Sequence, residues 1–424
     1  MRKFLLLGLW RDKSRSRLPV FVLAIGVTLT VFMHAYISGF MGDTIEMNAR
    51  FTFGHVKVMS RAYAELSEQM PNDLALASSS VWLSQLATDF PSMEWGERIH
   101  FGGLIDVPDS LGETKAQGPV AGFAYQLLGK EANEIKRLGL DKSIVRGKLP
   151  SNKGEALLSE HFAQRLGIEP GDTFTLMGST MNGGMAFYNL ILAGTIRFGV
   201  DIMDRGSVIL DIADARNALE MSDFTGEIVG FSKDGFYNDE QALLMAAQFN
   251  EQQSTSGDAY APVMKALSQQ GSMAMYVKMS EMWSFYVSLV FIFAMSLVLW
   301  NAGLLGGLRR YGEIGLRIAI GEEKKQVYFS MIYESILIGF AGTVIGTFTG
   351  LFFAWLLQTY GLDISGMMKG ASLMMPGVIK ARITMVDFYL GFFPGMLSTI
   401  LGTALSGIGI FKRQTASLFK ELET

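Results

Sequence analysis

The 424-residue sequence contains no cysteine, and that absence excludes several kinds of chemistry. Without thiols the chain forms no disulfide, builds no thiolate zinc site and has no cysteine nucleophile. Histidine is also scarce, since there are four and none falls in an HExxH-type spacing, so a metal site has little support. The formal net charge of −4 implies no broad basic surface, which argues against nucleic-acid binding.

The sequence also lacks a GxxxxGK[ST] loop of the kind that holds ATP phosphates. No Ser/His/Asp order, carboxylate pair or metal-ligand spacing stands out, so a membrane-anchored enzyme is the least supported class. If the chain moves a substrate, the energy must therefore come from a partner.

Apolar residues are concentrated in four blocks. Overall, 49% hydrophobic and 18% charged residues would also fit a soluble protein, so the distribution decides the class. Residues 18–40 contain no Asp, Glu, Lys or Arg. At about 1.5 Å per residue they reach roughly 34 Å, enough to cross a hydrocarbon core of about 30 Å. Residues 283–308, 327–358 and 387–411 each exceed the roughly 20 residues that a spanning helix needs. We therefore predict four transmembrane helices.

The first 17 residues combine leucines and Trp10 with six basic residues. This composition is typical of an amphipathic helix that lies at a membrane surface. A cleaved signal peptide is the alternative reading of residues 1–40. However, the apolar run is longer than the roughly 7–15 residues of a signal peptide, and no clear A-x-A site follows it. We expect an uncleaved anchor.

Residues 41–282 carry most of the charge and show mixed patterning without a spanning run. They are numerous enough for one sizeable α+β domain or two small ones. The fold class predicted is thus a membrane protein with a large α+β domain inserted between the first and second of four helices. Within the domain, strands are expected at residues 55–58, 173–176 and 207–210, helices at 160–166 and 213–219, and a polar loop at 250–258.

A short charged stretch, residues 309–326, separates the second and third predicted spans; we call it the coupling segment. Ile314, Ile318 and Gly321 recur at helical spacing, and charged residues occupy the other side. The segment is too polar to lie in hydrocarbon and too short to be a domain. Either a cytoplasmic partner grips it, or it is an interfacial helix that rests on lipid.

The third predicted span contains three glycines spaced by four residues: Gly342, Gly346 and Gly350. One helix face is therefore nearly bare of side chains, which favours a close helix–helix contact. That contact is either a dimer seam or packing against the first or second span of the same chain.

Basic residues in short loops predict the orientation. Residues 1–17, the coupling segment and the tail, residues 412–424, are all rich in Lys and Arg, and four spans place all three on one side. Both termini are then cytoplasmic. Residues 41–282 and the loop 359–386 lie outside.

Two ionisable residues fall within predicted spans. His34 lies in the outer half of the first, where an interfacial or packing role and a proton relay are the alternatives. Glu334 lies in the third, and either pairs with Arg310 or Arg317 or sits among headgroups at a span that starts later.

Residues 312–321, GEIGLRIAIG, resemble the "REIGLLRAIG" signature of the macrolide-exporter/FtsX superfamily of ABC transporter permeases. Residues 334–339, ESILIG, are similar to the "EALLLG" that follows it. Further similarity to the family's extracytoplasmic domain covers residues 146–150, 154–158, 166–172 and 193–196. The sequence departs from the family at Gly312, where a basic residue is common, and in its final residues. The lipoprotein-releasing permeases are the most similar subgroup by architecture.

The resemblance implies a bacterial inner-membrane subunit that works by mechanotransmission. A separate cytoplasmic ABC ATPase would bind ATP and Mg, with no cofactor in this chain, and a second permease would complete a homodimer or heterodimer. The coupling residues would be Glu313, Ile314, Arg317, Ile318, Gly321, Lys324 and Lys325, with the two isoleucines as buried anchors.

The substrate expected from the resemblance is a lipoprotein or other amphiphile drawn from membrane lipid. Apolar residues near the outer ends of the first two spans would line a cavity open to lipid; they are Phe32, Met33, Tyr36, Phe40, Met282, Phe285 and Tyr286. Ordinary lipid-facing surface is the alternative use of such residues. The alternative function is a regulator that moves no cargo and instead activates an extracytoplasmic partner such as a cell-wall hydrolase.

Overall fold

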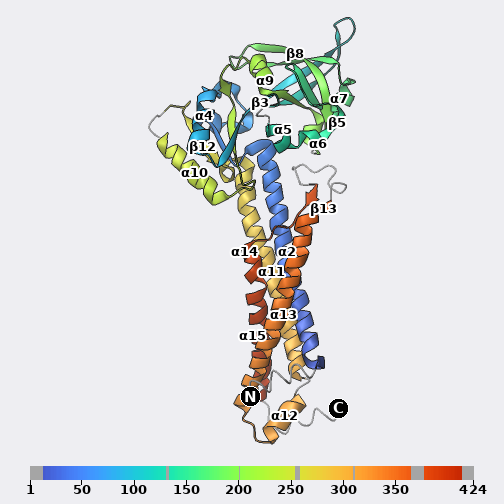
Figure 1. The fold of residues 1–424 in the computed structure, drawn as a ribbon, viewed down its shortest axis with the longest axis vertical. Helices are drawn as coiled ribbons and strands as arrows, with labels where there is room; N and C mark the ends of the chain where they lie inside the picture. Colours follow the sequence, from blue (N-terminus) through green and yellow to red (C-terminus); the bar gives the residue numbers. More distant parts are fainter. Residues whose placement is uncertain are drawn as a thin grey trace. The chain divides into compact units, whose positions relative to one another are not determined.

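The structure, a computed structural model, describes residues 13–129, 133–199, 201–253, 258–308, 311–363 and 377–412. The chain divides into two compact units. The helical unit comprises Met1–Gly42, Met279–Asp363 and Val378–Thr424, and the sheet unit comprises Asp43–Lys278 and Ile364–Gly377. Each is described separately, with the labels of Figure 1.

A ten-stranded mixed sheet forms the framework of the sheet unit. Its order is β12-β1-β11-β3-β4-β9-β6-β8-β5, with β7 pairing β3 and β8. The pairs β4/β9 and β6/β8 are parallel, and the other pairs are antiparallel. The strands are β1 (Val56–Ser60), β3 (Met93–Pro108), β4 (Thr114–Tyr125), β5 (Ile144–Gly147), β6 (Glu155–Ser159), β7 (Thr173–Ser179), β8 (Met185–Ile196), β9 (Ser207–Asp211), β11 (Glu227–Ser232) and β12 (Pro262–Ala266). A separate small sheet pairs β2 (Leu76–Ala77) with β10 (Phe224–Thr225).

Short helices connect the strands of this unit. Side-chain caps fix the start of three of them. Ser60 accepts a hydrogen bond from the amide of Tyr63, Asp211 accepts one from the amide of Ala213, and Asn238 accepts one from the amide of Gln241. The helices are α3 (Arg61–Glu65), α4 (Ser79–Asp89), α5 (Asn133–Leu138), α6 (Leu140–Ser143), α7 (Glu160–Leu166), α8 (Asp201–Arg205), α9 (Ile212–Leu219) and α10 (Asp239–Gln252). Single turns are formed by η1 (Ala49–Phe53), η2 (Ser67–Gln69), η3 (Asn72–Leu74) and η4 (Leu267–Gln269).

Strand β3 is shared by the two largest hydrophobic cores of the sheet unit. Its first part, Met93–Arg98, pairs with β11, beside the core that contains Val56, Leu86 and Phe249. Its second part pairs with β4 and β7 and contributes Ile99 and Ile105 to the other core. One continuous strand thus holds the two cores together.

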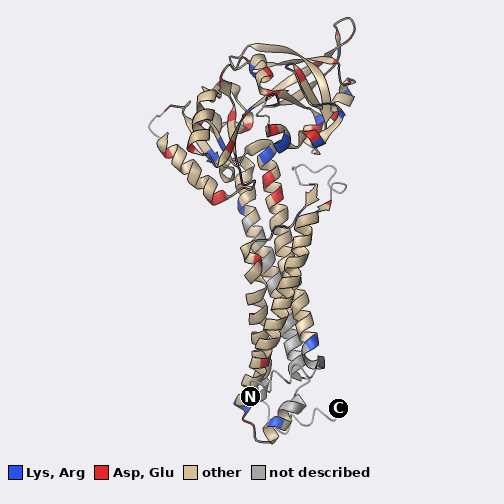
Figure 2. Cartoon of the chain, in the orientation of Figure 1, with Lys and Arg blue, Asp and Glu red and all other residues tan. Residues whose placement is uncertain are grey.

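Long helices make up the helical unit. They are α2 (Lys13–Asn48), α11 (Gly271–Leu308), α12 (Tyr311–Ala319), α13 (Lys324–Tyr360), α14 (Met385–Leu390) and α15 (Phe392–Lys412), and the ends of α2 and α11 extend into the sheet unit. Helix α13 packs along α15. The short strands β13 (Leu362–Asp363) and β14 (Val378–Ile379) pair beyond α13. Figure 2 shows few charged residues along α13 and α15.

Three helices within the described residues are long and apolar enough to cross a membrane: Arg17–Phe53, Lys324–Tyr360 and Met385–Leu405. The second predicted span, residues 283–308, lies within α11. The count of four spans therefore stays a prediction, whereas the membrane class and the large α+β unit agree with the sequence.

Several boundaries differ from those predicted. Helix α2 continues well past residue 40, to Asn48, and the last span is divided at Gly391 into α14 and α15. In the sheet unit the predicted helix at 160–166 and the three predicted strands are confirmed. The loop predicted at 250–258 was partly wrong, because α10 extends to Gln252. The predicted interfacial helix, residues 1–17, and the tail, 412–424, lie almost wholly outside the described residues.

Candidate functional site

The coupling segment folds as helix α12 followed by a tight turn into α13. Gly321 has a φ of +105°, in the left-handed region that side chains disfavour. The turn is closed by the amide of Gly321, which donates to Ile318 O over 3.1 Å, and by the amide of Glu322, which donates to Arg317 O over 3.0 Å. Glycine at 321 thus permits the connection between the two helices.

Arg317 fastens this turn to α13. Its Nε and Nη2 donate to the two carboxylate oxygens of Glu322 over 2.6 and 2.7 Å. Its Nη1 donates to Ser330 Oγ, 3.2 Å away on α13. The hydrogen bond from Arg317 lowers the pKa of the Glu322 carboxyl, so the pair is ionised at neutral pH. The bidentate geometry fixes the orientation of α12.

The apolar residues of α12 do not all face the same way. Ile318 is half-buried and packs against Val327 and Met331 of α13. Leu316 and Ile320, four residues apart, are 54% and 79% exposed. Ile318, which was predicted to anchor a partner, therefore packs within the chain. The exposed residues Leu316 and Ile320 were not predicted. The i, i+4 spacing of Leu316 and Ile320 is the signal that would have indicated them.

The other predicted coupling residues are distributed over the same region. Lys324 is half-buried and Lys325 is exposed, both in the first turn of α13. Glu313 and Ile314 belong to α12, but their side chains lie outside the described part of the structure, as does Arg310.

The three glycines of α13 lie against α2. A β-carbon at Gly342 would stand 2.7 Å from the Leu23 side chain, and one at Gly346 would stand 2.6 Å from the backbone oxygen of Ala24. A β-carbon at Gly350 would stand 2.9 Å from Val31. Of the two predicted alternatives, the structure shows the intrachain one. The glycine face of α13 packs against the first span and not against a second copy of the chain.

The residues predicted to line a substrate cavity lie on α2 and α11. The four on α2 are half-buried, and Phe32 packs against the cluster of Ala35, Ala354 and Ala381. Those on α11 are more exposed, with Met282 at 45%, Phe285 at 63% and Tyr286 at 52%. The two cavities described next are lined by residues of the sheet unit instead.

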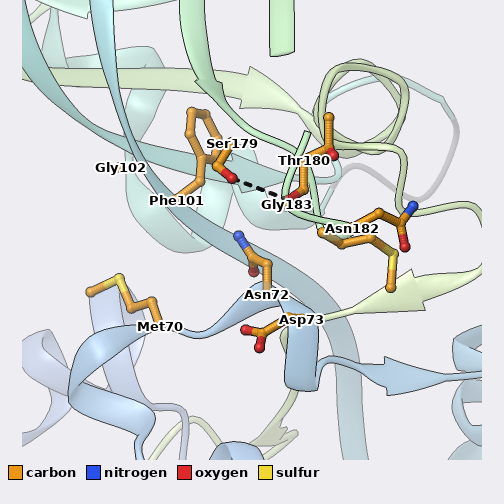
Figure 3. Close-up of a pocket in the computed structure, with 10 residues that line it drawn as sticks. Met70, Asn72, Asp73, Phe101, Gly102, Ser179, Thr180, Asn182 and Gly183 are labelled. Atoms are coloured by element: carbon orange, nitrogen blue, oxygen red, sulfur yellow. Dashed lines mark hydrogen bonds between the residues drawn. The ribbon is translucent and has the colours of Figure 1, made fainter. Parts of the chain in front are cut away.

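A cavity of about 490 Å³ opens between the η2–η3 region and the β7–β8 hairpin (Figure 3). Asn72 is among the residues that line it, and its Nδ2 donates to His100 O over 3.0 Å. A second cavity of about 520 Å³ is lined by residues of α7, α8 and the end of β8, including His161, Arg197 and Arg205. Sequence reasoning identified neither, because each gathers short segments that are far apart in the chain.

Buried ion pairs link β1 to β11 and β3 to α5. Lys57 Nζ is 2.8 Å from Glu227 Oε1, and Arg98 Nη2 is 2.9 Å from Glu134 Oε2, with all four side chains buried. Burial lowers the pKa of the Lys57 ammonium, and Glu227 offsets part of that effect. Nearby, burial lowers the pKa of the His100 imidazole to about 4, so His100 is neutral at pH 7.

Comparison with known proteins identifies the class. Residues 285–415 match the family described as FtsX-like permease C-terminal. The chain is 24% identical over 263 residues to the lipoprotein-releasing system transmembrane protein LolC of Haemophilus influenzae, which covers 60% of this chain. The chain spans about 61% of the length of that relative.

A solved structure, the periplasmic region of MacB from Actinobacillus actinomycetemcomitans, covers 53% of this chain and 92% of its own. Its TM-score is 0.36 at 9% identity, too low to base an argument on. The match over residues 285–415, together with the apolar helices, defines a membrane permease of the ABC transporter class. Residues 285–415 are thus similar to the C-terminal part of FtsX-like permeases, and the chain is similar to a permease of the lipoprotein-releasing type.

Proposed function

We propose that this chain is the membrane subunit of an ABC transporter that works by mechanotransmission in the bacterial inner membrane. A separate cytoplasmic ATPase binds ATP and Mg and grips the coupling segment. Conformational changes of the ATPase move α12 and α13 together, and this motion is transmitted to the sheet unit outside the membrane. The chain itself catalyses no reaction, and both of its termini are cytoplasmic.

The observation that carries this proposal is the fastening of α12 to α13. Arg317 makes two bonds to Glu322 and one to Ser330, and Ile318 packs on Val327 and Met331. A helix that only rested on lipid would need no such joint, whereas a helix that transmits force does. Leu316 on this helix and Ile320 directly after it remain exposed and offer apolar contacts to a partner.

The substrate we propose is a lipoprotein or another amphiphile taken from the membrane. The support is the relationship to LolC, whose name describes lipoprotein release. The family match covers residues 285–415 and none of residues 43–278, so it fits a regulator of an extracytoplasmic partner as well. Photocrosslinkers at Tyr36 and Phe285 separate the two: a trapped lipidated protein supports transport, and a soluble hydrolase trapped on the sheet unit supports regulation.

The coupling role is tested by Ile320→Asp. We expect the tagged variant, purified from its native membranes, to lose the co-purifying ATPase, because a carboxylate would have to be buried in the partner's groove. Ile202→Asp on α8 is the matched control, since Ile202 is 74% exposed against 79% for Ile320. Full retention of the ATPase by Ile320→Asp and Leu316→Asp would overturn the proposal.

The orientation has its own test, which the absence of native cysteine makes clean. A cysteine replacing exposed Lys325 should react only with reagents that reach the cytoplasm. One replacing Leu111, which is 85% exposed, should react from outside. Labelling of both positions from the same side would contradict the topology.

A further inference from the structure

The second cavity of the sheet unit, of about 520 Å³, has the size of a small-molecule site, for which roughly 300–1,000 Å³ is usual. Three segments of the chain line it: α7, the residue that follows β8, and the end of α8. The lining residues are Glu160, His161, Gln164, Arg197, Asp204 and Arg205, and none of these is apolar. The cavity therefore suits a polar ligand, and the charges of its walls decide which kind.

The carboxylate of Glu160 is already bound to donors of the protein itself. Its Oε2 accepts from Arg146 Nε over 3.0 Å and from the hydroxyl of Thr195. Its Oε1 accepts from Gln164 Nε2 over 2.6 Å. The residue is only 6% exposed, and the Arg146 guanidinium offsets its charge. Glu160 is therefore part of the frame of the cavity and does not make it a cation site.

The second acidic residue, Asp204, fixes the wall formed by α8. Its Oδ1 accepts from the amide of Phe198 over 2.8 Å, and its Oδ2 accepts from the amide of Gly199 over 3.0 Å. Its backbone oxygen accepts from Ser159 Oγ over 2.9 Å, which ties α8 to the end of β6. Each carboxylate oxygen thus already accepts a hydrogen bond, and α8 is held to the sheet.

The basic side chains of the lining are accessible. Arg197 and His161 are exposed, and within the described residues neither side chain makes a hydrogen bond or an ion pair. Arg205 is also exposed and adds a second guanidinium, although it has an interaction within the chain as well. These donors belong to three separate segments. Such an origin suits a tetrahedral oxyanion, whose oxygens point in several directions, better than a planar carboxylate.

We propose that this cavity binds a phosphate group, carried either by a phospholipid headgroup or by a soluble phosphate compound. A guanidinium can donate two parallel hydrogen bonds to phosphate oxygens, so Arg197 is the principal ligand. His161 and Arg205 donate from the walls formed by α7 and α8. The volume leaves room for the group to which the phosphate is attached. This binding site is independent of the transport proposal.

The test uses the full chain, in which the absence of native cysteine allows a single label at a chosen position. Ile202 on α8 is 74% exposed and is not among the lining residues, so Ile202→Cys can carry an environment-sensitive fluorophore beside the cavity. The labelled chain, purified in a phosphate-free detergent, is titrated with inorganic phosphate at constant ionic strength. We expect a saturable change in fluorescence. Arg197→Gln should weaken binding about tenfold or more, because a hydrogen bond to a charged group is lost.

Arg165→Gln is the matched control for the loss of charge. Arg165 is an exposed arginine on the same helix as His161, and it does not line the cavity. Its replacement should leave the affinity for phosphate unchanged. Arg197→Lys keeps the charge but loses the paired donors, so it should bind with intermediate affinity. Equal weakening by Arg165→Gln and Arg197→Gln would assign binding to overall charge and would overturn the proposal.

Reconstitution distinguishes the two sources of the phosphate group. The labelled chain is placed in vesicles of phosphatidylcholine, with or without phosphatidic acid, in phosphate-free buffer. A fluorescence change that requires phosphatidic acid and is lost in Arg197→Gln supports a lipid headgroup as the ligand. A change that requires added inorganic phosphate supports a soluble compound. A response in neither experiment, or a response that Arg197→Gln leaves unaltered, would show that the cavity is not a phosphate site.

Discussion

The sheet unit and the helical unit bury polar groups for different environments. In the sheet unit, charged side chains are buried as ion pairs, Lys57 with Glu227 and Arg98 with Glu134. In the helical unit, the long helices carry few charged residues. There α13 contacts α2 closely at Gly342, Gly346 and Gly350, instead of through ion pairs. In water, the hydrophobic effect stabilises the packing of the sheet unit. Lipid provides no such effect between helices, so the helical unit depends on van der Waals contact between complementary surfaces.

This difference between the two units predicts that the largest loss of stability comes from breaking a buried ion pair. Lys57→Met should destabilise the sheet unit by about 3–5 kcal/mol, because Glu227 is left buried without a counter-ion. The measurement is hydrogen exchange of the β1 and β11 amides in the full chain.

The matched control is the double variant Lys57→Met/Glu227→Leu, which removes both charges. It should recover most of the loss, since apolar replacement of a whole pair is often neutral. Equal losses of stability in the single and double variants would mean that packing, and not charge, stabilises the contact between Lys57 and Glu227.

A second effect is the acid sensitivity of the sheet unit. The folded-state pKa of His100 is about 4, below the ordinary value of 6.5, so the unfolded chain binds the proton first as pH falls. Stability should therefore drop by about 3 kcal/mol between pH 6.5 and 4 and change little from this source above pH 7. Denaturation at several pH values should show this slope, and His100→Asn should reduce it. An unchanged slope in His100→Asn would assign the acid sensitivity to other groups.

Shape-based packing in the helical unit predicts a smaller loss. Gly346→Ala places a methyl group 2.6 Å from the Ala24 oxygen, which is backbone and cannot move aside cheaply. We expect a cost of about 1–3 kcal/mol, as for overpacked cores. Unfolding of the purified chain in detergent would measure it. Ile345→Ala, at the neighbouring 48% exposed position, should cost less.

The smallest effect concerns the joint at α12. Arg317→Lys keeps the charge but loses the two-pronged contact with Glu322. Both groups are partly exposed, so the loss of stability should be about 1 kcal/mol or less. Faster hydrogen exchange at the Glu322 amide, which donates to Arg317 O, would report it. Exchange that is unchanged in Arg317→Lys but faster in Ile318→Ala would assign the joint to apolar packing.

Much of the helical unit was predictable because its signals are local. The apolar runs and the spacing of the three glycines depend on neighbouring positions in the sequence, and so does the helix at residues 160–166. The partner of the glycine face was not predictable, because the contact with Leu23 and Val31 joins residues more than three hundred positions apart.

The candidate site shows the same limit more sharply. Helical periodicity identified Ile314 and Ile318, but not that Ile318 would meet α13. That contact depends on the turn at Gly321, which brings Ile318 onto Val327 and leaves Ile320 outside. The hydrogen bond between His34 Nδ1 and Asp387 Oδ1 was likewise not predictable, although His34 stood out as an ionisable residue in an apolar run.

Strand β3 makes the two cores of the sheet unit mechanically inseparable. Because its sixteen residues pair with β11 at one end and with β4 and β7 at the other, no loop lies between the cores to act as a hinge. A force applied at either end of β3 would act along the strand as shear. The hydrogen bonds to β11, β4 and β7 lie across the strand and would resist this force together. The sheet unit should accordingly respond to a pull as one rigid piece.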